Sequence, residues 1–328
     1  MRIVICLAML AVTSPTTQNP HALELPTRLD ALLNDGKWDS TPNGFRIITL
    51  SHLADGCAGQ GLSHPARREE ARRCIQRTLS LAQRSMPTKS LSEVRDGLWL
   101  THLNLIYGAA DQLGACPSSV IHRQLSERLA AMSLADKHAH APSYVATALR
   151  WPADQSATLA SLSRYDTSHR THLHDRPSAV WQVMVGTAER LPASEITGGV
   201  ATSNLPRGCA NAFLTRYTAE FAPELSHAWW TTFRDTWALQ VGPFTGLREW
   251  PPGVERAADV DSGPIIMGIG TAASALSISA ARAQGDEAFA STLEASATQV
   301  MALGVAGGVP TMMLADAISF EGHWHQKH

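Results

Sequence analysis

Charged residues are scarce in this sequence, and their signs nearly cancel. They make up 17% of the 328 residues, and 27 lysines and arginines stand against 29 aspartates and glutamates, for a net charge of −2. Proteins that bind nucleic acid carry clustered basic charge and a high isoelectric point. The composition therefore offers no electrostatic case for nucleic acid, and we expect the partner to be a small neutral molecule or a glycan.

The chain also lacks a linker and lacks strand-like alternation outside short pieces. No long polar, Ser/Gly-rich or charged segment divides it, which favours one domain over residues 23–328. Helical patterns recur in pairs joined by turns, about every 40 to 50 residues, a spacing shared by toroids of helix pairs. We predict an all-α fold with the architecture of an (α/α) barrel, a six-fold toroid of helical hairpins.

No apolar run near the N-terminus is long enough to span a membrane. Residues 3–12 form an unbroken run of ten apolar residues, against the 20 or so that a transmembrane helix needs. With Arg2 before it and a polar stretch after it, this run is typical of a secretory signal peptide over residues 1–22. We expect a periplasmic or secreted protein, anchored at its N-terminus if the leader is not cleaved.

Several chemical signatures are missing as well. No phosphate-binding loop, dinucleotide fingerprint or nucleophile elbow is present, so we predict no cofactor. The cysteines lack zinc-type spacing, and neither the polar cluster over residues 166–175 nor the histidine-rich tail over 323–328 matches a known metal site, so we predict no metal. Four cysteines remain after the leader, Cys57, Cys74, Cys116 and Cys209, and the sequence cannot choose among their three pairings.

The stretch over residues 248–264 concentrates acids, prolines and glycines. It begins REWPPG and ends DVDSGP, and the uncharged run over residues 265–276 that follows reads as a buried helix. Prolines and glycines constrain the loop, and charge at the mouth of a buried helix is costly unless it serves a ligand. We predict part of an active site here. The alternative is that Asp261 and Ser262 only cap a helix opening at Pro264.

Two other loops resemble this one, because each carries proline or glycine and a charge directly before a helix: WPADQ over residues 151–155 and NLPRGC over 204–209. In a ring of hairpins, alternate loops meet at one end of a central funnel. A histidine on the apolar stripe over 98–106 joins the set, although a hydrogen-bonded core role is the alternative for it. The catalytic candidates are His102, Asp154, Glu249 and Asp261, and the substrate-binding candidates are Trp151, Arg207, Cys209, Arg248, Trp250 and Asp259.

Each candidate has a chemical reason and an ordinary alternative. Neighbouring carboxyls can have their pKa values pushed apart, so that one acts as acid and the other as base. An arginine beside them holds an anionic group, and tryptophans form flat apolar walls. Cys209 is expected at a helix N-terminus, where a thiolate is favoured, or else as a packed residue or half of a disulfide. Caps and ion pairs are the alternatives for the other charged residues.

At residues 151–154, 205–208 and 248–264 the chain resembles the linalool dehydratase/isomerase-like family, with the resemblance covering roughly residues 40–320. The resemblance implies an (α/α) barrel and cofactor-independent isomerisation and dehydration of terpene alcohols by acid/base groups around a hydrophobic pocket. His102 is similar to the family's helix histidine, and Asp154 to an acid after a Pro-x pair. Ala153 stands where the family has a cysteine, a departure from its pattern.

These observations predict a cofactor-independent acid/base lyase or isomerase, dehydratase-like, that acts on a neutral alcohol such as a terpenoid in a central funnel. Two alternatives remain open at this stage. The first is a glycan-active hydrolase or lyase, since paired carboxylates between tryptophans suit glycosidic bonds. The second is a non-catalytic periplasmic protein that binds a glycan or lipid.

Overall fold

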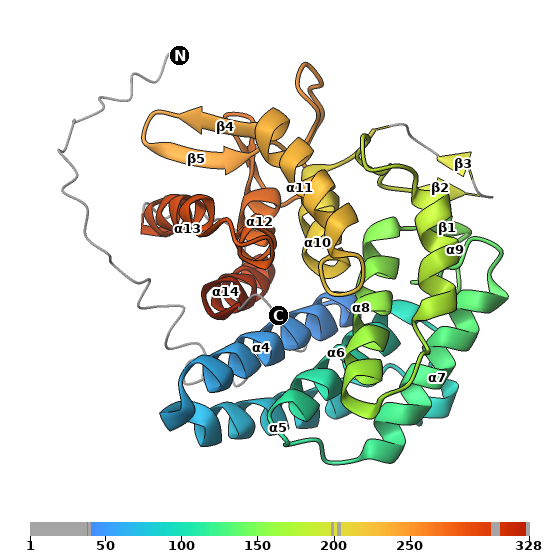
Figure 1. Ribbon diagram of the computed structural model, residues 1–328. Helices are drawn as coiled ribbons and strands as arrows, with labels where there is room; N and C mark the ends of the chain where they lie inside the picture. The colour runs from blue at the N-terminus through green and yellow to red at the C-terminus, as the bar shows by residue number, and fades with distance from the viewer. Residues whose placement is uncertain (1–37, 39–40, 198–199, 202–204, 303–308, 326–328) are drawn as a thin grey trace.

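The computed structural model describes residues 38, 41–197, 200–201, 205–302 and 309–325. These residues form eleven α-helices and a few short strands (Figure 1), so the all-α prediction is confirmed. None of the helices within these ranges is long and apolar enough to cross a membrane. The signal peptide predicted over 1–22 and the helix predicted over 23–33 lie outside the described residues.

Most helices occur as consecutive pairs, as the sequence predicts. Each even-numbered helix packs against the next even-numbered one, α14 packs against α4, and each odd-numbered helix packs against the even-numbered helix before it. The helices are α4 (Asn43–Ser63), α5 (Arg68–Arg84), α6 (Gly97–Gln112), α7 (Ser119–Ala135), α8 (Pro152–His169), α9 (Asp175–Val185), α10 (Gly208–Thr218), α11 (Pro223–Trp237), α12 (Thr271–Ala283), α13 (Glu287–Ala302) and α14 (Val309–Trp324).

The even-numbered helices α6 and α8 run parallel. Thr101 and Thr158 share a hydrogen bond of 2.7 Å, and Asn104 donates one of 3.0 Å to Ser161. Both pairs are separated by the same 57 residues, which only parallel helices allow. The loops that precede these two helices therefore lie at one end of the molecule, which positions the site described below.

Helices α10 and α12 also begin side by side. A side chain at Gly208, the first residue of α10, would clash with the carbonyl oxygen of Arg248 and the methyl group of Ala273. The close approach requires glycine at this position. It joins the start of α10 to the loop after β5 and to the first turn of α12.

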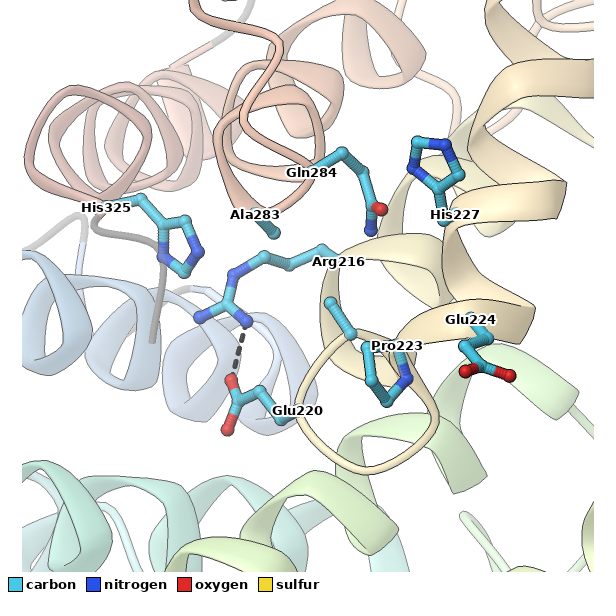
Figure 2. A pocket seen from close by; sticks show the side chains of 9 residues that line it. Arg216, Glu220, Pro223, Glu224, His227, Ala283, Gln284 and His325 are labelled. Carbon is cyan, nitrogen blue, oxygen red and sulfur yellow. Dashed lines mark hydrogen bonds and ion pairs between the residues drawn. The ribbon is translucent and has the colours of Figure 1, made fainter.

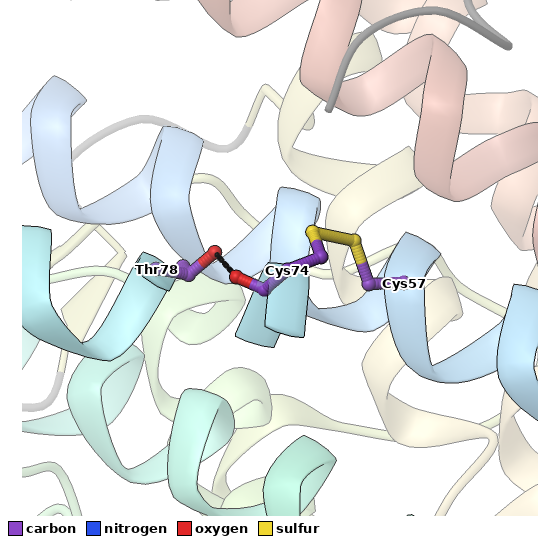
Figure 3. Close-up of a disulfide and its surroundings, with 3 residues drawn as sticks. All are labelled: Cys57, Cys74 and Thr78. Carbon is purple, nitrogen blue, oxygen red and sulfur yellow. Dashed lines mark hydrogen bonds between the residues drawn. A yellow bond between two sulfur atoms is a disulfide. The ribbon is translucent and has the colours of Figure 1, made fainter. Parts of the chain in front are cut away.

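The core consists of apolar side chains on helices that are buried on most faces. In α6 every residue from Gly97 to Ala110 is buried, which explains why this segment shows so little polar pattern. A disulfide between Cys57 and Cys74 joins α4 to α5 (Figure 3), a pairing that the sequence left open. Cys116 and Cys209 are free thiols.

Two predicted helices differ from the structure. The helix expected to begin near residue 263 begins at Thr271, because a hairpin occupies the residues before it. The hairpin consists of β6 (Ile265–Ile266) and β7 (Ile269–Gly270). Its turn residues, Met267 and Gly268, have φ values of 52° and 88°. Uncharged apolar runs do not distinguish a short strand from a helix. The helix expected over 181–191 is α9, which ends at Val185, because Gly186 (φ 100°) leaves the helical conformation.

The remaining strands are short. An antiparallel three-stranded sheet has the order β1, β2, β3, and β4 pairs with β5 in a hairpin that projects beside α11 and α12 (Figure 1). The bounds are β1 (Leu149–Arg150), β2 (Ile196–Thr197), β3 (Val200–Ala201), β4 (Ala238–Val241) and β5 (Phe244–Leu247).

Candidate functional site

Arg207 lies between two carboxylates at the start of α10. Its Nε donates to Glu249 at 2.9 Å, and its Nη2 donates to Asp259 at 2.8 Å. The other Glu249 oxygen accepts the backbone N–H of Cys209 at 3.1 Å, and the Glu249 side chain is completely buried. Glu249 therefore satisfies one of the unpaired amides at the N-terminus of α10 and complements its dipole.

The thiol of Cys209 also points at this carboxylate. It donates to Glu249 over 3.1 Å, and burial, followed by the negative charge of Glu249, raises the pKa of Cys209 well above its ordinary value. The raised pKa disfavours a thiolate here and favours the alternative of a packed residue, and Cys209 is a free thiol rather than half of a disulfide.

Trp250 does not form an open flat wall. The guanidinium groups of Arg207 and Arg256 lie over its ring, 5.1 and 5.5 Å from the ring centroid. Such cation–π contacts occupy ring surface that a sugar or hydrocarbon would need. Trp250 therefore holds the arginines of the loop in place.

The loop that carries Asp259 and Asp261 is fastened by its own hydrogen bonds. Asp259 accepts the backbone N–H groups of Asp261 at 3.0 Å and Ser262 at 2.9 Å. The carbonyl of Ser262 accepts the N–H of Ala272 in the first turn of α12, at 3.2 Å. A backbone carbonyl, rather than the Asp261 side chain, thus contacts this helix, and Asp261 is an exposed residue.

Asp154, in the first turn of α8, lies close to Asp261. It accepts a hydrogen bond of 2.6 Å from Ser143, while burial, reinforced by the charge of Asp261, raises its pKa to about 6. Burial and the same two carboxylates raise the pKa of Tyr144 to about 12. The Tyr144 ring in turn meets Trp151 edge-on, with centroids 6.0 Å apart. Asp154 and Asp261 thus interact electrostatically, and Trp151 lies beside Tyr144.

His102 lies deeper, among core residues. It is completely buried, and its Nδ1 lies 2.6 Å from the hydroxyl of Ser51 on α4. Burial, followed by the charge of His52, lowers the pKa of His102 to about 3, so the ring is neutral at physiological pH. Both histidine rings flank Phe213, each with centroids 6.1 Å from it. The hydrogen bond of His102 goes to Ser51 and not to a predicted acid.

Arg248 also lies apart from the other candidates. Its backbone N–H bonds to Trp237 at 3.0 Å, and its guanidinium lies over Gly268 in the β6–β7 turn. The side chain therefore points toward that hairpin, away from Arg207. Alternation along an extended segment explains the difference, since Arg248 and Glu249 project to opposite sides.

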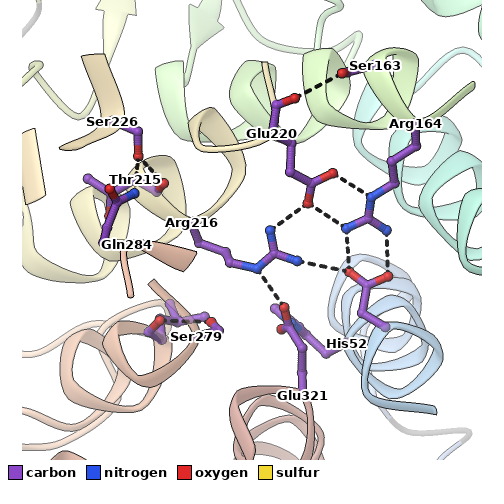
Figure 4. Close-up of polar contacts among 12 residues, drawn as sticks. His52, Ser163, Arg164, Thr215, Arg216, Glu220, Ser226, Ser279, Gln284 and Glu321 are labelled. Atoms are coloured by element: carbon purple, nitrogen blue, oxygen red, sulfur yellow. Dashed lines mark hydrogen bonds and ion pairs between the residues drawn. The ribbon is translucent and has the colours of Figure 1, made fainter. Parts of the chain in front are cut away.

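Sequence reasoning missed a group of buried charges on the inner helices. We call it the buried ion cluster, and it consists of His52, Asp55, Arg164, Arg216, Glu220 and Glu321 (Figure 4). Arg164 donates to both oxygens of Asp55, at 2.6 and 3.0 Å, and to Glu220 at 2.7 Å. One available signal was Arg216, the single charged residue of α10.

A second half of the cluster centres on Arg216. Its Nε donates to Glu321 at 2.9 Å and its Nη1 to Glu220 at 2.6 Å, and His52 also contacts Glu321. Burial by itself would raise the pKa of Glu321, but the charges of His52 and Arg216 outweigh it and hold that pKa well below its usual range. The cluster is thus a mutually neutralised core of charges, as burial demands.

A pocket of about 440 Å³ opens beside this cluster, between α10, α11 and α12. Arg216, Glu220, His227, Gln284 and His325 are among its lining residues (Figure 2). Arg216 is nine residues along the chain from Arg207, or about 13 Å of α-helix. The pocket therefore lies toward the end of α10 opposite the predicted acids, and those acids line the loop surface at the other end.

No protein-family model matches the chain, and no curated protein matches it. The resemblance drawn from the three loops therefore stays a prediction.

Proposed function

We propose that the loops before α8, α10 and α12 form an acid/base active site, and that the chain is a cofactor-independent lyase or isomerase acting on a neutral alcohol. The observation that carries the proposal is the pair Asp154 and Asp261. One carboxyl of the pair has a pKa raised to about 6, close to the range in which a side chain can both give and take a proton. The resemblance of the same loops to the linalool dehydratase/isomerase-like family supports this proposal.

Asp154 is the acid in this scheme. Protonated Asp154 gives its proton to the hydroxyl of the substrate, the C–O bond breaks, and water leaves. Asp261, an exposed carboxylate, takes the proton from the neighbouring carbon, and the electrons of that C–H bond form the alkene. Exchange with solvent then returns Asp154 to its protonated form and Asp261 to its carboxylate. Tyr144 and Trp151 supply an aromatic wall for an apolar substrate.

The other candidates position this pair. Glu249 and Asp259 hold Arg207, which ties the loop of Asp261 to the start of α10. We propose that the even-numbered helices form the inner ring of an (α/α) barrel, a packing supported by the contact of each with the next and of α14 with α4. The proposed site then lies at one rim of that ring. The disulfide supports the proposal of an exported protein, since disulfides persist in oxidising compartments.

The test is a mass-spectrometric screen of purified protein against pooled terpene alcohols. We expect a product that is lighter by one water, or isomeric, and its loss in both Asp154→Asn and Asp261→Asn, with unchanged circular dichroism. Asp235→Asn, an exposed aspartate on α11, is the matched control and should retain full turnover. Turnover that persists in Asp154→Asn would overturn the assignment.

A glycan remains the second candidate substrate, because an aromatic pair beside two carboxyls also suits a sugar ring. A parallel pool of oligosaccharides distinguishes it. Cleavage that depends on Asp154 and Asp261 would place the chain among glycan-active enzymes. Binding without product from either pool would favour a binding protein.

A further inference from the structure

Three metal-ligand side chains converge where α6, α7 and α8 meet, away from the proposed active site. The Nδ1 atom of His122 lies 2.7 Å from a carboxylate oxygen of Asp111, and the Nε2 atom of His169 lies 2.9 Å from the same oxygen. All three ligand atoms lie within 4.8 Å of one another. We propose that Asp111, His122 and His169 form a binding site for a divalent transition metal of the zinc class.

The residues come from three rigid elements. Asp111 is in the last turn of α6, His122 is in the first turn of α7, and His169 is the last residue of α8. Packing of α6 against both other helices fixes their relative positions. Ligands on helices are held more precisely than ligands on loops, so an ion would meet a largely preformed set.

Two buried tyrosines hold the imidazole rings. Tyr107 stacks on His122 with centroids 5.8 Å apart and an interplanar angle of 25°. Tyr165 meets His122 edge-on at 4.8 Å and lies against His169 at 4.3 Å. These aromatic contacts restrict the rotation of both imidazole rings.

The ligand set suits zinc in chemistry and size. Zinc binds imidazole nitrogen and carboxylate oxygen at about 2.0 to 2.2 Å, which separates tetrahedral ligand atoms by roughly 3.3 Å. The two nitrogen–oxygen distances are 2.7 and 2.9 Å within a set that spans at most 4.8 Å, so binding requires these pairs to open by about half an ångström and the two nitrogens to approach the same spacing. Each ligating nitrogen must be deprotonated, and binding therefore shifts or releases the protons that now lie between these atoms. Nitrogen donors disfavour calcium and magnesium, which prefer oxygen alone.

The site is open on one side. The side chain of His122 is completely buried, but those of Asp111 and His169 are 13% and 29% exposed, which gives an ion a path from solvent. The three side chains leave a fourth position for water, as in zinc sites with three protein ligands.

Most of the neighbouring polar cluster over residues 166–175 has another role. Asp166 accepts the backbone N–H groups of Leu173 at 2.9 Å and His174 at 2.8 Å, and the ring nitrogen Nδ1 of His174 lies 2.7 Å from it. These contacts anchor the turn after α8. Of the cluster that the sequence singled out, His169 alone points toward Asp111 and His122.

The experiment uses the full chain, freed of any purification tag and treated with a chelator. We expect calorimetric titration with zinc to give one site per chain, and cobalt(II) to give the visible absorption of a four-coordinate ion. His169→Gln is the key variant, because its amide can still donate to Asp111 while the metal ligand is lost. We expect it to weaken zinc binding at least about 100-fold, beyond the effect of losing an outer-shell partner.

His172→Ala is the matched control, because His172 is three residues away and its side chain is 83% exposed. It should bind zinc and cobalt as the unmodified chain does. The histidines of the C-terminal tail are present in every variant, so their contribution cancels.

Two results would overturn the proposal. One is equal zinc affinity in His169→Gln and in the unmodified chain, which would place the ion elsewhere. The other is no zinc binding by the folded, chelator-treated chain, which would leave Asp111 as a hydrogen-bonded bridge between two imidazoles. Circular dichroism of His169→Gln shows whether the helices persist, and Asp111→Asn provides a second ligand deletion with the same expected loss.

Discussion

The buried carboxylate of Glu249 accepts a hydrogen bond of 2.9 Å from Nε of Arg207. Because Glu249 also binds the N–H and the thiol of Cys209, both of its oxygens are occupied by the protein. This arrangement makes Glu249 an anchor of the loop rather than a carboxylate aimed at substrate. It separates Glu249 from Asp154 and Asp261, with which the sequence analysis had grouped it.

We expect Glu249→Gln to lower the free energy of unfolding by about 2 kcal/mol, since it removes the buried charge that accepts from Arg207 and leaves Asp259 as the other carboxylate beside that arginine. Urea unfolding followed by circular dichroism measures the change. Glu255→Gln, at an exposed position of the same loop, should be neutral. Equal stability of the two variants would return Glu249 to the catalytic candidates.

Asp154→Asn should change the pH dependence of stability in a defined direction. The folded-state pKa of Asp154, about 6, lies above the ordinary value of 3.8, so the wild-type fold loses stability as pH rises through this interval. Asparagine does not titrate and can still accept the hydrogen bond from Ser143. The stability of Asp154→Asn relative to wild type should therefore rise between these pH values and level off above them. Denaturant midpoints across the pH range test this, and parallel curves would contradict it.

We expect Arg164→Met to be among the most damaging substitutions. It removes one of the two arginines that pair with both Asp55 and Glu220, and removal of one partner of a buried pair costs about 3 to 5 kcal/mol. Arg73→Met on the exposed face of α5 is the control. Thermal unfolding should separate the two clearly. A mild effect at Arg164 would mean that water enters the buried ion cluster.

Loss of the disulfide should destabilise the pair α4 and α5. Cys57 and Cys74 are 17 residues apart, and closing a loop of that size stabilises a fold by about 3 kcal/mol in the chain-entropy model. We expect the free energy of unfolding of the double variant Cys57→Ser/Cys74→Ser to be lower by this amount, which lowers its denaturant midpoint. A reductant should bring the unmodified chain to the same midpoint. Cys116→Ser should have the same denaturant midpoint as the unmodified chain, and a reductant should lower both midpoints equally. A reductant without effect on the unmodified chain would contradict the bond.

The helices were predictable because their signals are local. The pattern over residues 118–134 predicts an amphipathic helix and that over 223–239 the second helix of a pair, and α7 and α11 lie within two residues of those bounds. The three loops were recognisable for the same reason, since proline, glycine and charge stand together in each. The hairpin over residues 265–270 was missed because its turn places a methionine at positive φ. Residues other than glycine seldom adopt this conformation, so the residue type did not predict a turn.

The sequence by itself determined an all-α protein with acids placed directly before buried helices, because helical periodicity and loop composition act over a few neighbouring residues. Only the tertiary structure decided which charges meet. Arg164 and Asp55 are 109 residues apart, and His52 and Glu321 are 269 apart. His169 likewise reaches Asp111 across 58 residues. No local pattern encodes such pairs, since they depend on which helices pack together once the apolar faces are buried.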